Sequence, residues 1–485
     1  MMTSIKQKKS LFWKCAAAAA FFIAILLLAY SPSSGYTNSY QPIEGILFLD
    51  QNDTPLPNQI VGNNDNSNQC SATKDGQPST EYAVMIDAGS SGSRVHVYKF
   101  KICSGDPELE DEVFHMLEPG LSSYAEDPTA AAESLKELMA IAVESVPKEK
   151  QTCTPIAVKA TAGLRLLGQE KSDRILKSVR KYLETYPFPI AGEHGVEVMD
   201  GKDEGVYAWI TVNYLLGKLK KSQQGQSAAI FDLGGASTQI VFEPTFSVPS
   251  ESMSEGEHKY QLDYQNITHQ LYQHSYLGYG LKEARKQIKS AVVDIWQSES
   301  AIGDKVYHPC LPSDYEEEFT LSNGSQIQLV GTGAGHAACR GVIEKVFRKE
   351  KLCELAPCAF DGVYQPPLTE TFKDRDLYVF SFFYDLTQPL GMPSEFSVRE
   401  LGELTERVCR GDTKPFQHVP KAVQLLKDTP GYCLDLTYIY NLLKFGYDIP
   451  NDRLVRTAKK IQGAETGWCL GASIAMLDEN KLCQI

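Results

Sequence analysis

The chain has 485 residues, of which 42% are hydrophobic and 22% charged, a composition typical of a globular protein long enough for two or three packed lobes. Its 36 glycines and 25 prolines are near average usage, which excludes a collagen-like, coiled-coil or mainly disordered chain. The formal net charge is −14, and −18 without the four lysines of residues 1–30. This charge excludes a nucleic-acid binder that depends on a basic surface, and an anionic substrate would need a metal ion or backbone dipoles to offset it.

The first 30 residues predict a membrane anchor. Residues 15–30 form an uncharged run, which the preceding Leu-Phe-Trp extends towards the ~20 residues needed to cross a bilayer. Because lysines precede the run, the positive-inside rule predicts a cytoplasmic tail over 1–14 and a type II orientation. The alternative is a cleaved signal peptide, but the Tyr-Ser-Pro that follows is a poor cleavage site. Residues 31–80, rich in Ser, Asn, Gln, Pro and Gly, predict a flexible stem.

The cysteines and glycosylation sequons are those of a chain in an oxidising compartment. Cys15 belongs to the anchor, and the other eleven cysteines contain no C-x-x-C pair, which favours disulfides over a zinc ribbon or a thioredoxin motif. Nearest-neighbour pairing leaves Cys70 over and predicts five bridges, although the sequence leaves connectivity open: Cys103–Cys153, Cys310–Cys339, Cys353–Cys358, Cys409–Cys433 and Cys469–Cys483. Sequons stand at Asn52, Asn266 and Asn323, a number close to chance for this length.

From residue 81 strands and helices alternate, which predicts α/β layers rather than a sandwich or a bundle. In chain order, the expected elements are strands at 83–87 and 94–102, a helix at 130–146, a strand at 155–161, a helix at 172–186, a strand at 196–199, a helix at 204–219, strands at 228–232 and 238–242, a helix near 281–292, a strand at 377–383, and helices after Ser397 and after Asp435.

One pattern occurs twice, 145 residues apart. Residues 83–97 and 228–241 both have the order strand, Asp, any residue, Gly, a turn of small residues, strand. The repeat predicts two similar lobes that present the same loop to a shared cleft.

The repeated loop has the residues of a phosphate site. Asp87 and Asp232 lie at strand ends, where α/β sheets bind ligands, and suit a hydrated cation such as Mg²⁺. The residues that follow supply backbone N–H groups and hydroxyls for two successive phosphates: Gly89, Ser90, Ser91, Gly92 and Ser93 in the first loop, and Gly234, Gly235, Ala236 and Ser237 in the second. The alternative, which a single copy would favour, is an ordinary hairpin with Asp and Gly as turn formers.

Three other segments offer catalytic or binding groups. The turn at 159–167, which contains Thr161 and Arg165, opens a helix and could hold an anion, although Arg165 could equally pair with a carboxylate. Glu204 lies in the first turn of a predicted helix, whose dipole favours the ionised carboxylate, so it is a candidate general base; the alternative is a common helix-start acid. Ser237 and Gln239 alternate along a strand and face one side, where they could position a water or simply pack.

An aromatic cluster offers a place for a nucleobase. Phe383 or Tyr384 could stack on a base, although a buried strand is the simpler explanation for most of these rings.

Five segments together resemble the conserved regions of the apyrase family, the nucleoside triphosphate diphosphohydrolases, in the family's order: 86–94, 159–167, 203–209, 232–239 and 467–472. The resemblance extends from about residue 81 to the C-terminus. It implies an α/β fold of two actin-like, ribonuclease-H-like lobes with a central cleft, here residues 81–198 plus 466–485, and 199–465. It also implies hydrolysis of a nucleotide's terminal phosphate with Ca²⁺, Mg²⁺ or Mn²⁺. Ala236 stands where many relatives have glycine.

By motif match, the resemblance implies that Glu204 is the base, that Ser237 and Gln239 orient water, and that Asp87 and Asp232 hold the metal through water. The segments 357–366, 383–385 and 467–473 look most like the fungal Golgi members of the family. That likeness implies GDP, and UDP, as substrates, and a lumenal role in Golgi glycosylation, with no prediction of oligomeric state. The alternatives are a broad-specificity apyrase, a related actin-like kinase or exopolyphosphatase, and a non-enzymatic lumenal glycoprotein.

Overall fold

The computed structural model describes residues 79–102, 107–248, 252–264, 267–299, 305–313 and 315–479. All described residues belong to one compact unit. The predicted tail and anchor lie outside the described residues, as do Asn52, Asn266, Cys70, Cys103 and Cys483. The predicted stem does so up to residue 78, whereas its last two residues, Ser79 and Thr80, already belong to the first strand. Within the part of the chain that is described, every helix is too short or too polar to cross a membrane.

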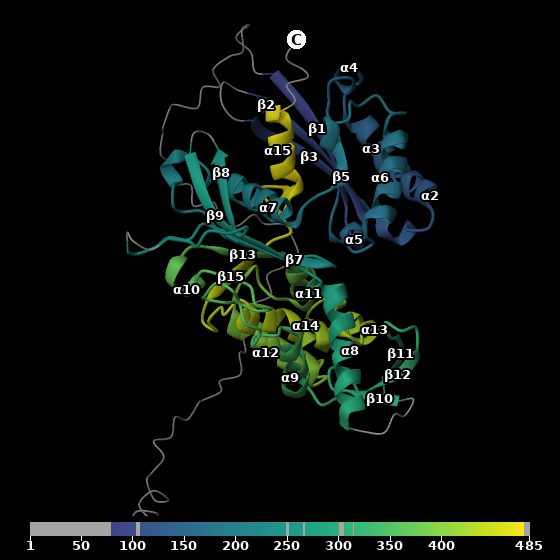
Figure 1. Cartoon of the computed structure of the whole chain (residues 1–485), viewed down its shortest axis with the longest axis vertical. Coiled ribbons are helices and arrows are strands. Elements are labelled where there is room, and N and C mark those ends of the chain that lie inside the picture. Colours follow the sequence, from purple (N-terminus) through teal and green to yellow (C-terminus); the bar gives the residue numbers. More distant parts are fainter. Residues whose placement is uncertain are drawn as a thin grey trace, which may run out of the picture. The chain divides into compact units, whose positions relative to one another are not determined.

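The N-terminal half of the body is built on a five-stranded sheet (Figure 1). Its order is β3-β2-β1-β4-β5, with β1, β2 and β3 antiparallel and β4 and β5 parallel to β1. The strands are β1 (Ser79–Ala88), β2 (Ser93–Ile102), β3 (Pro107–Leu117), β4 (Ile156–Ala160) and β5 (Val196–Val198). The apolar run of β1 places it between two partners, because a central strand buries both faces.

A seven-stranded sheet repeats this topology. Its order is β8-β9-β7-β6-β13-β15-β14, so β9-β7-β6-β13-β15 matches β3-β2-β1-β4-β5 in both order and direction. The strands are β6 (Ala229–Leu233), β7 (Ser237–Phe242), β8 (Lys259–Tyr264), β9 (Ile267–Leu277), β13 (Leu377–Ser381), β14 (Glu395–Ser397) and β15 (Leu454–Thr457). The predicted α/β class is therefore confirmed, and the repeated Asp-Gly loop joins equivalent strands, β1 to β2 and β6 to β7.

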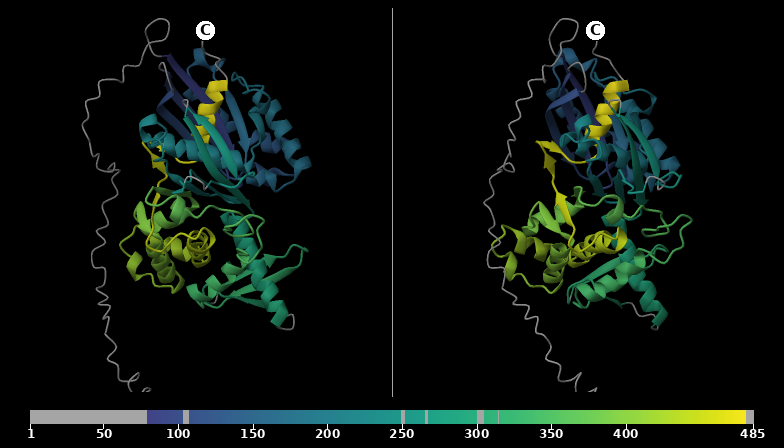
Figure 2. Two further views of the ribbon diagram at one scale, coloured as in Figure 1. Left: turned by 60° about the vertical axis from the view of Figure 1, so that its left-hand side comes forward. Right: turned by 90° about the vertical axis from the view of Figure 1, so that its left-hand side faces the viewer.

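Helices cover both faces of the first sheet (Figures 1 and 2). Alternate side chains of β1 point to opposite faces, so Val84 and Ile86 pack with α3 and α6, whereas Met85 packs with Trp209 of α7 and Leu470 of α15. The helices are α2 (Pro128–Glu133), α3 (Lys136–Ser145), α4 (Lys148–Gln151), α5 (Ala162–Arg165), α6 (Gln169–Leu183), α7 (Gly201–Leu215) and α15 (Cys469–Glu479). The C-terminal α15 thus packs against β1 and α7, and its core is shared with strands of the second sheet.

The remaining helices pack on the second sheet. They are α8 (Leu281–Glu299), α9 (His336–Val346), α10 (Leu368–Thr371), α11 (Phe382–Thr387), α12 (Val398–Cys409), α13 (Ala422–Asp428) and α14 (Tyr432–Asn441). A small sheet of β10 (Lys305–His308), β11 (Glu316–Thr320) and β12 (Gln326–Gly331), and a ribbon of β16 (Lys460–Ile461) and β17 (Ala464–Glu465), complete the elements. The sequon Asn323 lies in the exposed turn between β11 and β12, where its side chain accepts hydrogen bonds from Ser325.

One helix prediction and one strand prediction need correction. The single helix expected at 130–146 is two helices, because the Ser134 hydroxyl donates to the Ala131 carbonyl where α2 ends. The strand expected at 377–383 ends at Ser381, whose φ is +57°, and α11 begins at the next residue. This sharp change of direction puts residues of α11, rather than a continued strand, beside the site described below.

The disulfides follow the predicted pairing in part. Cys310–Cys339, Cys353–Cys358 and Cys409–Cys433 are formed, and Cys153 is disulfide-bonded, although its predicted partner lies outside the described residues. The predicted Cys469–Cys483 bridge is wrong: Cys469 is a free thiol, buried where α15 begins. Burial raises the pKa of this thiol well above its ordinary value.

Candidate active site

A cavity of about 390 Å³ joins residues that are far apart in the sequence. Its wall contains the ends of β1 and β6, the first turn of α7, the start of α11 and the chain before α15. The described residues around it include most of the predicted site: Asp87, Gly89, Ser90, Ser91, Thr161, Glu204, Asp232, Gly234, Gly235 and Tyr384. Gly92, Ser93, Ala236, Ser237, Gln239 and Phe383 do not line it.

Asp87 and Asp232 occupy equivalent positions at the ends of β1 and β6. Each is buried, and in each the Oδ1 atom has no hydrogen-bond partner among the described residues. An ionised oxygen without a partner is costly to bury, so both atoms fit a role as acceptors for a hydrated cation. Burial, with the neighbouring Asp87 carboxylate, raises the pKa of Asp232 to about 6, whereas hydrogen bonding from Ser381 and the charge of Arg94 oppose the rise.

Arg94 is a site residue to which sequence reasoning assigned no role. Its Nη1 donates to Asp87 Oδ2 at 2.9 Å. The two residues are cross-strand partners in the β1–β2 register, a signal that becomes visible once the hairpin is placed. The position of Arg94 also explains why residue 89 is a glycine, because a Cβ there would lie 2.7 Å from Arg94 Nη1.

The two glycine loops face each other. Gly235 approaches Ser90 so closely that a Cβ at Gly235 would collide with the Ser90 hydroxyl and lie 3.1 Å from the Ser91 hydroxyl. On its other side, the first loop rests on the start of α5, where a Cβ at Gly163 would lie 2.8 Å from Ser90 Cα. This arrangement is the one predicted from the repeat, and phosphate binding by the loops remains a prediction.

Glu204 lines the same cavity as the glycine loops and the two aspartates. The Asp200 side chain caps α7 by accepting from Lys202 N, which starts the helix one turn before Glu204. The Glu204 side chain is buried, lines the cavity and forms an ion pair with Arg165. Of the two partners considered for Arg165, the structure therefore supplies the carboxylate.

The protonation of Glu204 differs from the expectation based on the helix dipole. Burial, with the charges of Asp232 and Asp87, raises the pKa of Glu204 to about 8, although Arg165 opposes the rise. Desolvation of a buried carboxylate thus outweighs the helix start, whose contribution is typically ~0.3–1 kcal/mol. A group that is protonated below pH 8 becomes a base as its proton is lost, so its pKa suits proton transfer near neutral pH.

Ser237 and Gln239 lie behind the cavity wall, on one side of β7 as predicted. Gln239 Nε2 donates to Ser237 Oγ at 2.8 Å and to Ser275 Oγ at 3.0 Å, whereas its buried Oε1 has no partner among the described residues. Ser275, the cross-strand partner of Gln239 on β9, was missed because nothing in the sequence places that strand beside β7. The first turns of α7 pack against Gln239, because a Cβ at Gly205 would be 3.4 Å from Gln239 Cβ.

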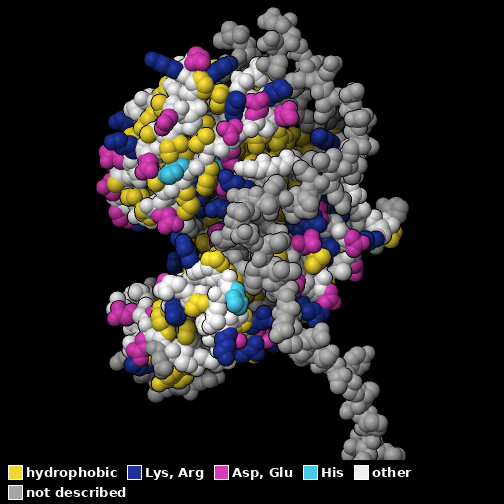
Figure 3. Space-filling view, turned by 180° about the vertical axis from the view of Figure 1, so that it is seen from behind, with side chains coloured by type: hydrophobic (Ala, Val, Ile, Leu, Met, Phe, Trp, Pro, Cys, Tyr) yellow, Lys and Arg dark blue, Asp and Glu magenta, His cyan; other side chains and the backbone are white. Residues whose placement is uncertain are grey.

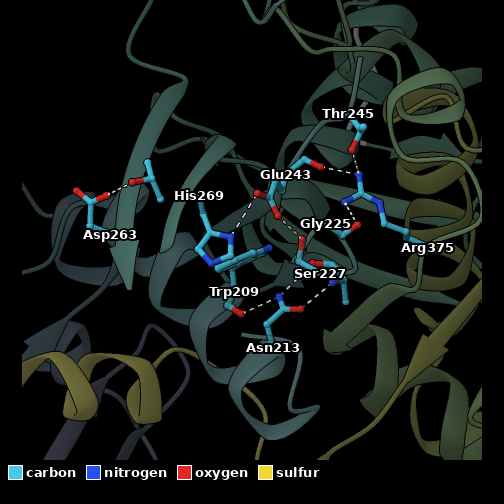
Figure 4. A network of polar contacts seen from close by, with 11 residues as sticks. Trp209, Asn213, Gly225, Ser227, Glu243, Thr245, Asp263, His269 and Arg375 are labelled. Atoms are coloured by element: carbon cyan, nitrogen blue, oxygen red, sulfur yellow. Dashed lines mark hydrogen bonds and ion pairs between the residues drawn. The ribbon is translucent and has the colours of Figure 1, made fainter. Parts of the chain in front are cut away.

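A buried polar network fixes α7 relative to β6 (Figure 4). Asn213 of α7 accepts from Ala228 N at 2.6 Å and donates to the Ala228 and Trp209 carbonyls. The neighbouring Ser227 hydroxyl donates to Glu243, which also contacts His269 at 3.3 Å. These contacts hold the helix that carries Glu204 against the strand that carries Asp232.

At the other end of the cavity, Tyr384 and Phe383 are separated. Tyr384 lines the cavity, whereas Phe383 is completely buried in the core of the second sheet and cannot reach a ligand. His96 and Trp468 also line the cavity, the latter from the segment that leads into α15. Tyr384 is therefore the remaining candidate for stacking on a base.

The cavity is acidic. Among the described residues that line it, six carry a carboxylic acid and two a cationic side chain, Arg94 and Lys459. On the molecular face shown in Figure 3, acidic and basic side chains are interspersed. No group of three or more His, Cys, Asp or Glu side chains in the described ranges is close enough to cage a metal ion directly. Two carboxylates with unpartnered oxygens instead fit a cation that keeps most of its water ligands.

Comparison with known proteins agrees with this geometry. Residues 73–484 match the GDA1/CD39 (nucleoside phosphatase) family. The chain belongs to this family. It is 49% identical over 429 residues to the guanosine-diphosphatase of Schizosaccharomyces pombe, covering 86% of this chain and 77% of the relative. It is 46% identical over 425 residues to the guanosine-diphosphatase of Saccharomyces cerevisiae, covering 84% and 82% respectively.

This member of the GDA1/CD39 family also resembles a solved structure. The crystal structure of nucleoside triphosphate hydrolases from Neospora caninum has a TM-score of 0.56 and 15% identity, covering 84% of this chain and 94% of that one. At that identity the likeness concerns the fold alone. The apyrase resemblance predicted from the five motifs is confirmed, and the protein is a hydrolase of nucleoside phosphates.

Proposed function

We propose that this GDA1/CD39 family member hydrolyses GDP, and UDP, to the nucleoside monophosphate and orthophosphate. The observation that carries the proposal is the convergence of Asp87, Asp232 and Glu204 on one cavity between two facing glycine loops. Two loops match the two phosphates of a diphosphate, and the fungal relatives that are nearly half identical are named guanosine-diphosphatases.

The proposed reaction is attack of water on the terminal phosphorus. Glu204 removes the proton, the water oxygen bonds to that phosphorus, and the bond from this phosphorus to the bridging oxygen breaks. The monophosphate leaves with the bridging oxygen, and the other product is orthophosphate. Ser237 and Gln239 would orient the water from behind the cavity wall, where Gln239 Oε1 has no partner among the described residues. The loops would keep the terminal phosphate in line, since positioning and charge stabilisation dominate phosphoryl transfer.

A divalent cation, Ca²⁺, Mg²⁺ or Mn²⁺, is part of the proposal. When bound, it would neutralise phosphate charge and polarise the phosphoryl oxygens. Asp87 and Asp232 would hold it through water, and Arg94 keeps Asp87 oriented. An acid-rich cavity would otherwise repel the substrate.

The proposed setting is the Golgi lumen. The lysine-flanked apolar run at 15–30 supports a type II anchor, and the disulfides support an oxidising compartment. GDP and UDP are products of lumenal glycosyl transfer, so their hydrolysis would support glycosylation and the exchange of monophosphate for nucleotide sugar. Protease treatment of sealed microsomes should spare the body, and digestion of the body would contradict this orientation.

The activity is tested by phosphate release from a panel of GDP, UDP, GTP and GMP, with the purified full-length chain and Mg²⁺, Ca²⁺ or Mn²⁺. We expect release from the diphosphates, little from GTP and none from GMP. Equal use of GTP and GDP would favour a broad-specificity apyrase, and no release from any nucleotide would contradict the proposal.

A further inference from the structure

Three carboxylates of the cavity have no place in the proposed chemistry, Glu118, Asp385 and Glu465, and of these Asp385 is the one beside Tyr384. Asp385 lies in the first turn of α11, directly after Tyr384, and lines the cavity. Its side chain forms no hydrogen bond or ion pair with another described residue, whereas Asp87 is paired with Arg94 and Glu204 with Arg165. A solvent-facing carboxylate is an acceptor with two free oxygens, so Asp385 is available to a ligand.

Asp385 lies on the cavity wall one helical turn beyond Ser381. The turn that starts α11 begins at Ser381, whose side chain interacts with Asp232 at the phosphate end. The chain then continues along the cavity wall through Phe382 to Tyr384 and Asp385, one helical turn further. A nucleotide with its phosphates between the glycine loops would extend its base towards these two residues.

The two neighbours meet a planar ligand from different directions. Successive residues of a helix point about 100° apart, yet the side chains of Tyr384 and Asp385 both reach the same cavity. A base stacked on the Tyr384 ring would therefore present its edge, rather than its face, to the Asp385 carboxylate. The ribose hydroxyls are the other nucleoside groups that a carboxylate can accept from, and the experiment below distinguishes them.

Guanine is the base whose edge complements a carboxylate. Its N1–H and N2 amino groups are two adjacent donors, which match two carboxylate oxygens. Hypoxanthine offers the N1–H donor alone, and xanthine places a carbonyl oxygen where guanine has its amino group. Cytosine carries an acceptor nitrogen in the middle of the same edge, which a carboxylate repels.

We propose that Asp385 determines base specificity by accepting hydrogen bonds from the guanine N1–H and N2 amino groups of a nucleotide stacked on Tyr384. This inference rests on the proposed diphosphatase function, whose base preference it explains. Asp385 acts on binding and orientation rather than on the reacting phosphate.

The test is Asp385→Asn in the full-length chain, assayed for kcat/KM with the diphosphates of guanosine, inosine, xanthosine and cytidine. The amide replaces one acceptor by a donor, which clashes with the guanine amino group but complements the xanthine carbonyl. We expect kcat/KM for GDP to fall about 10- to 100-fold, the range of a bidentate base contact. We expect kcat/KM for xanthosine diphosphate to rise at least 10-fold, and kcat/KM for cytidine diphosphate not to fall, because the amide can donate to the cytosine nitrogen that the carboxylate repels.

The gain with xanthosine diphosphate cannot arise from misfolding, and cytidine diphosphate serves as an internal control for folding and catalysis. Asp428→Asn, an exposed aspartate on α13, is the matched control and should leave the ratios unchanged. In the wild type, kcat/KM should be highest for guanosine diphosphate, lower for inosine diphosphate and lowest of these three for xanthosine diphosphate.

Two outcomes would overturn the inference while leaving the diphosphatase function intact: a similar loss for all four substrates in Asp385→Asn, as a ribose contact predicts, or an unchanged ratio of GDP to xanthosine diphosphate. Failure of the wild type to hydrolyse any of the four would instead overturn the proposed function, and this inference with it.

Discussion

Arg165 and Glu204 form an ion pair in which the guanidinium Nη2 donates to the carboxylate Oε2. The pair joins α5, which follows the first sheet's β4, to the first turn of α7. Arg165 is the largest influence that favours the ionised form of Glu204, against burial and two neighbouring carboxylates that favour the protonated form. A residue outside the repeated loops therefore opposes the rise in the pKa of the candidate base that burial causes.

This relationship predicts the pH dependence of activity. A base must be ionised, and burial raises the pKa of Glu204 to about 8, so kcat/KM should rise with pH on an acidic limb well above 4.5, the ordinary value for Glu. Arg165→Met removes the opposing charge, so the limb should move to higher pH. Profiles of kcat/KM at fixed, saturating cation concentration measure the shift.

Arg174→Met, an exposed arginine on α6, is the control and should leave the profile unchanged. An Arg165→Met profile that coincides with the wild type would show that Arg165 does not tune the base.

Removal of the divalent cation should abolish activity. The cavity carries more carboxylates than cations, so a chelator leaves the diphosphate facing uncompensated negative charge. Asp232→Asn keeps the side-chain volume but loses the charge, and we expect half-maximal activity to require at least a tenfold higher cation concentration. Titration of activity with Mg²⁺ after chelation measures this, with Asp428→Asn as the control. Full activity in the presence of a chelator would contradict the proposal that hydrolysis needs a divalent cation.

The contact between α5 and the first loop predicts the effect of one methyl group. A Cβ at Gly163 would lie 2.8 Å from Ser90 Cα and 3.2 Å from Ser90 N, so Gly163→Ala must displace backbone rather than a flexible side chain. We expect a loss of about 1–3 kcal/mol in unfolding free energy and a rise in KM of at least tenfold. Denaturant unfolding and steady-state kinetics measure the two effects.

Gly341→Ala is the matched control, because Gly341 lies in α9 with open space where a Cβ would be. Alanine is a better helix former than glycine, so this variant should be as stable as the wild type or about 1 kcal/mol more stable. Equal effects of the two substitutions would contradict the role of the Gly163–Ser90 contact.

Much of the fold follows from local sequence patterns. The runs that form β1, β4, β6 and β7 are short and apolar, and the repeated Asp-Gly turn predicted the equivalence of the two sheets. In contrast, β3 was not predicted, because its residues Glu108 to Glu112 are mostly acidic and lack clean alternation. It forms as the edge strand of its sheet, where polar side chains face solvent, and its Glu112 is held by His96 at 2.7 Å and by Glu465 N.

The site was predicted where a motif carries both the residue and its local geometry. Asp87, Asp232 and Glu204 end a strand or begin a helix, so their placement follows from the elements themselves. Arg94 meets Asp87 only once the hairpin is formed, Ser275 lies on a strand distant in sequence from Gln239, and Asp385 follows a turn that local propensity does not reveal. The strained Ser381 backbone, which turns β13 into α11, is such a case, because a non-glycine residue at positive φ is maintained by the surrounding structure.

The central claim, that Glu204 is the general base, is tested most directly by kcat of Glu204→Gln. Glutamine keeps the size and hydrogen bonding of the side chain but cannot accept the proton from water. Burial raises the pKa of Glu204 above the ordinary value of 4.5. The contribution of this group to folding stability is therefore fully present below pH 4.5 and is lost as the pH rises through about 8. The variant does not ionise, so its Tm should equal or exceed that of the wild type above pH 8, which confirms folding. We predict a fall in kcat of ~10²–10⁴ with nucleotide binding retained. A folded variant that keeps more than about a tenth of the wild-type kcat would contradict the account.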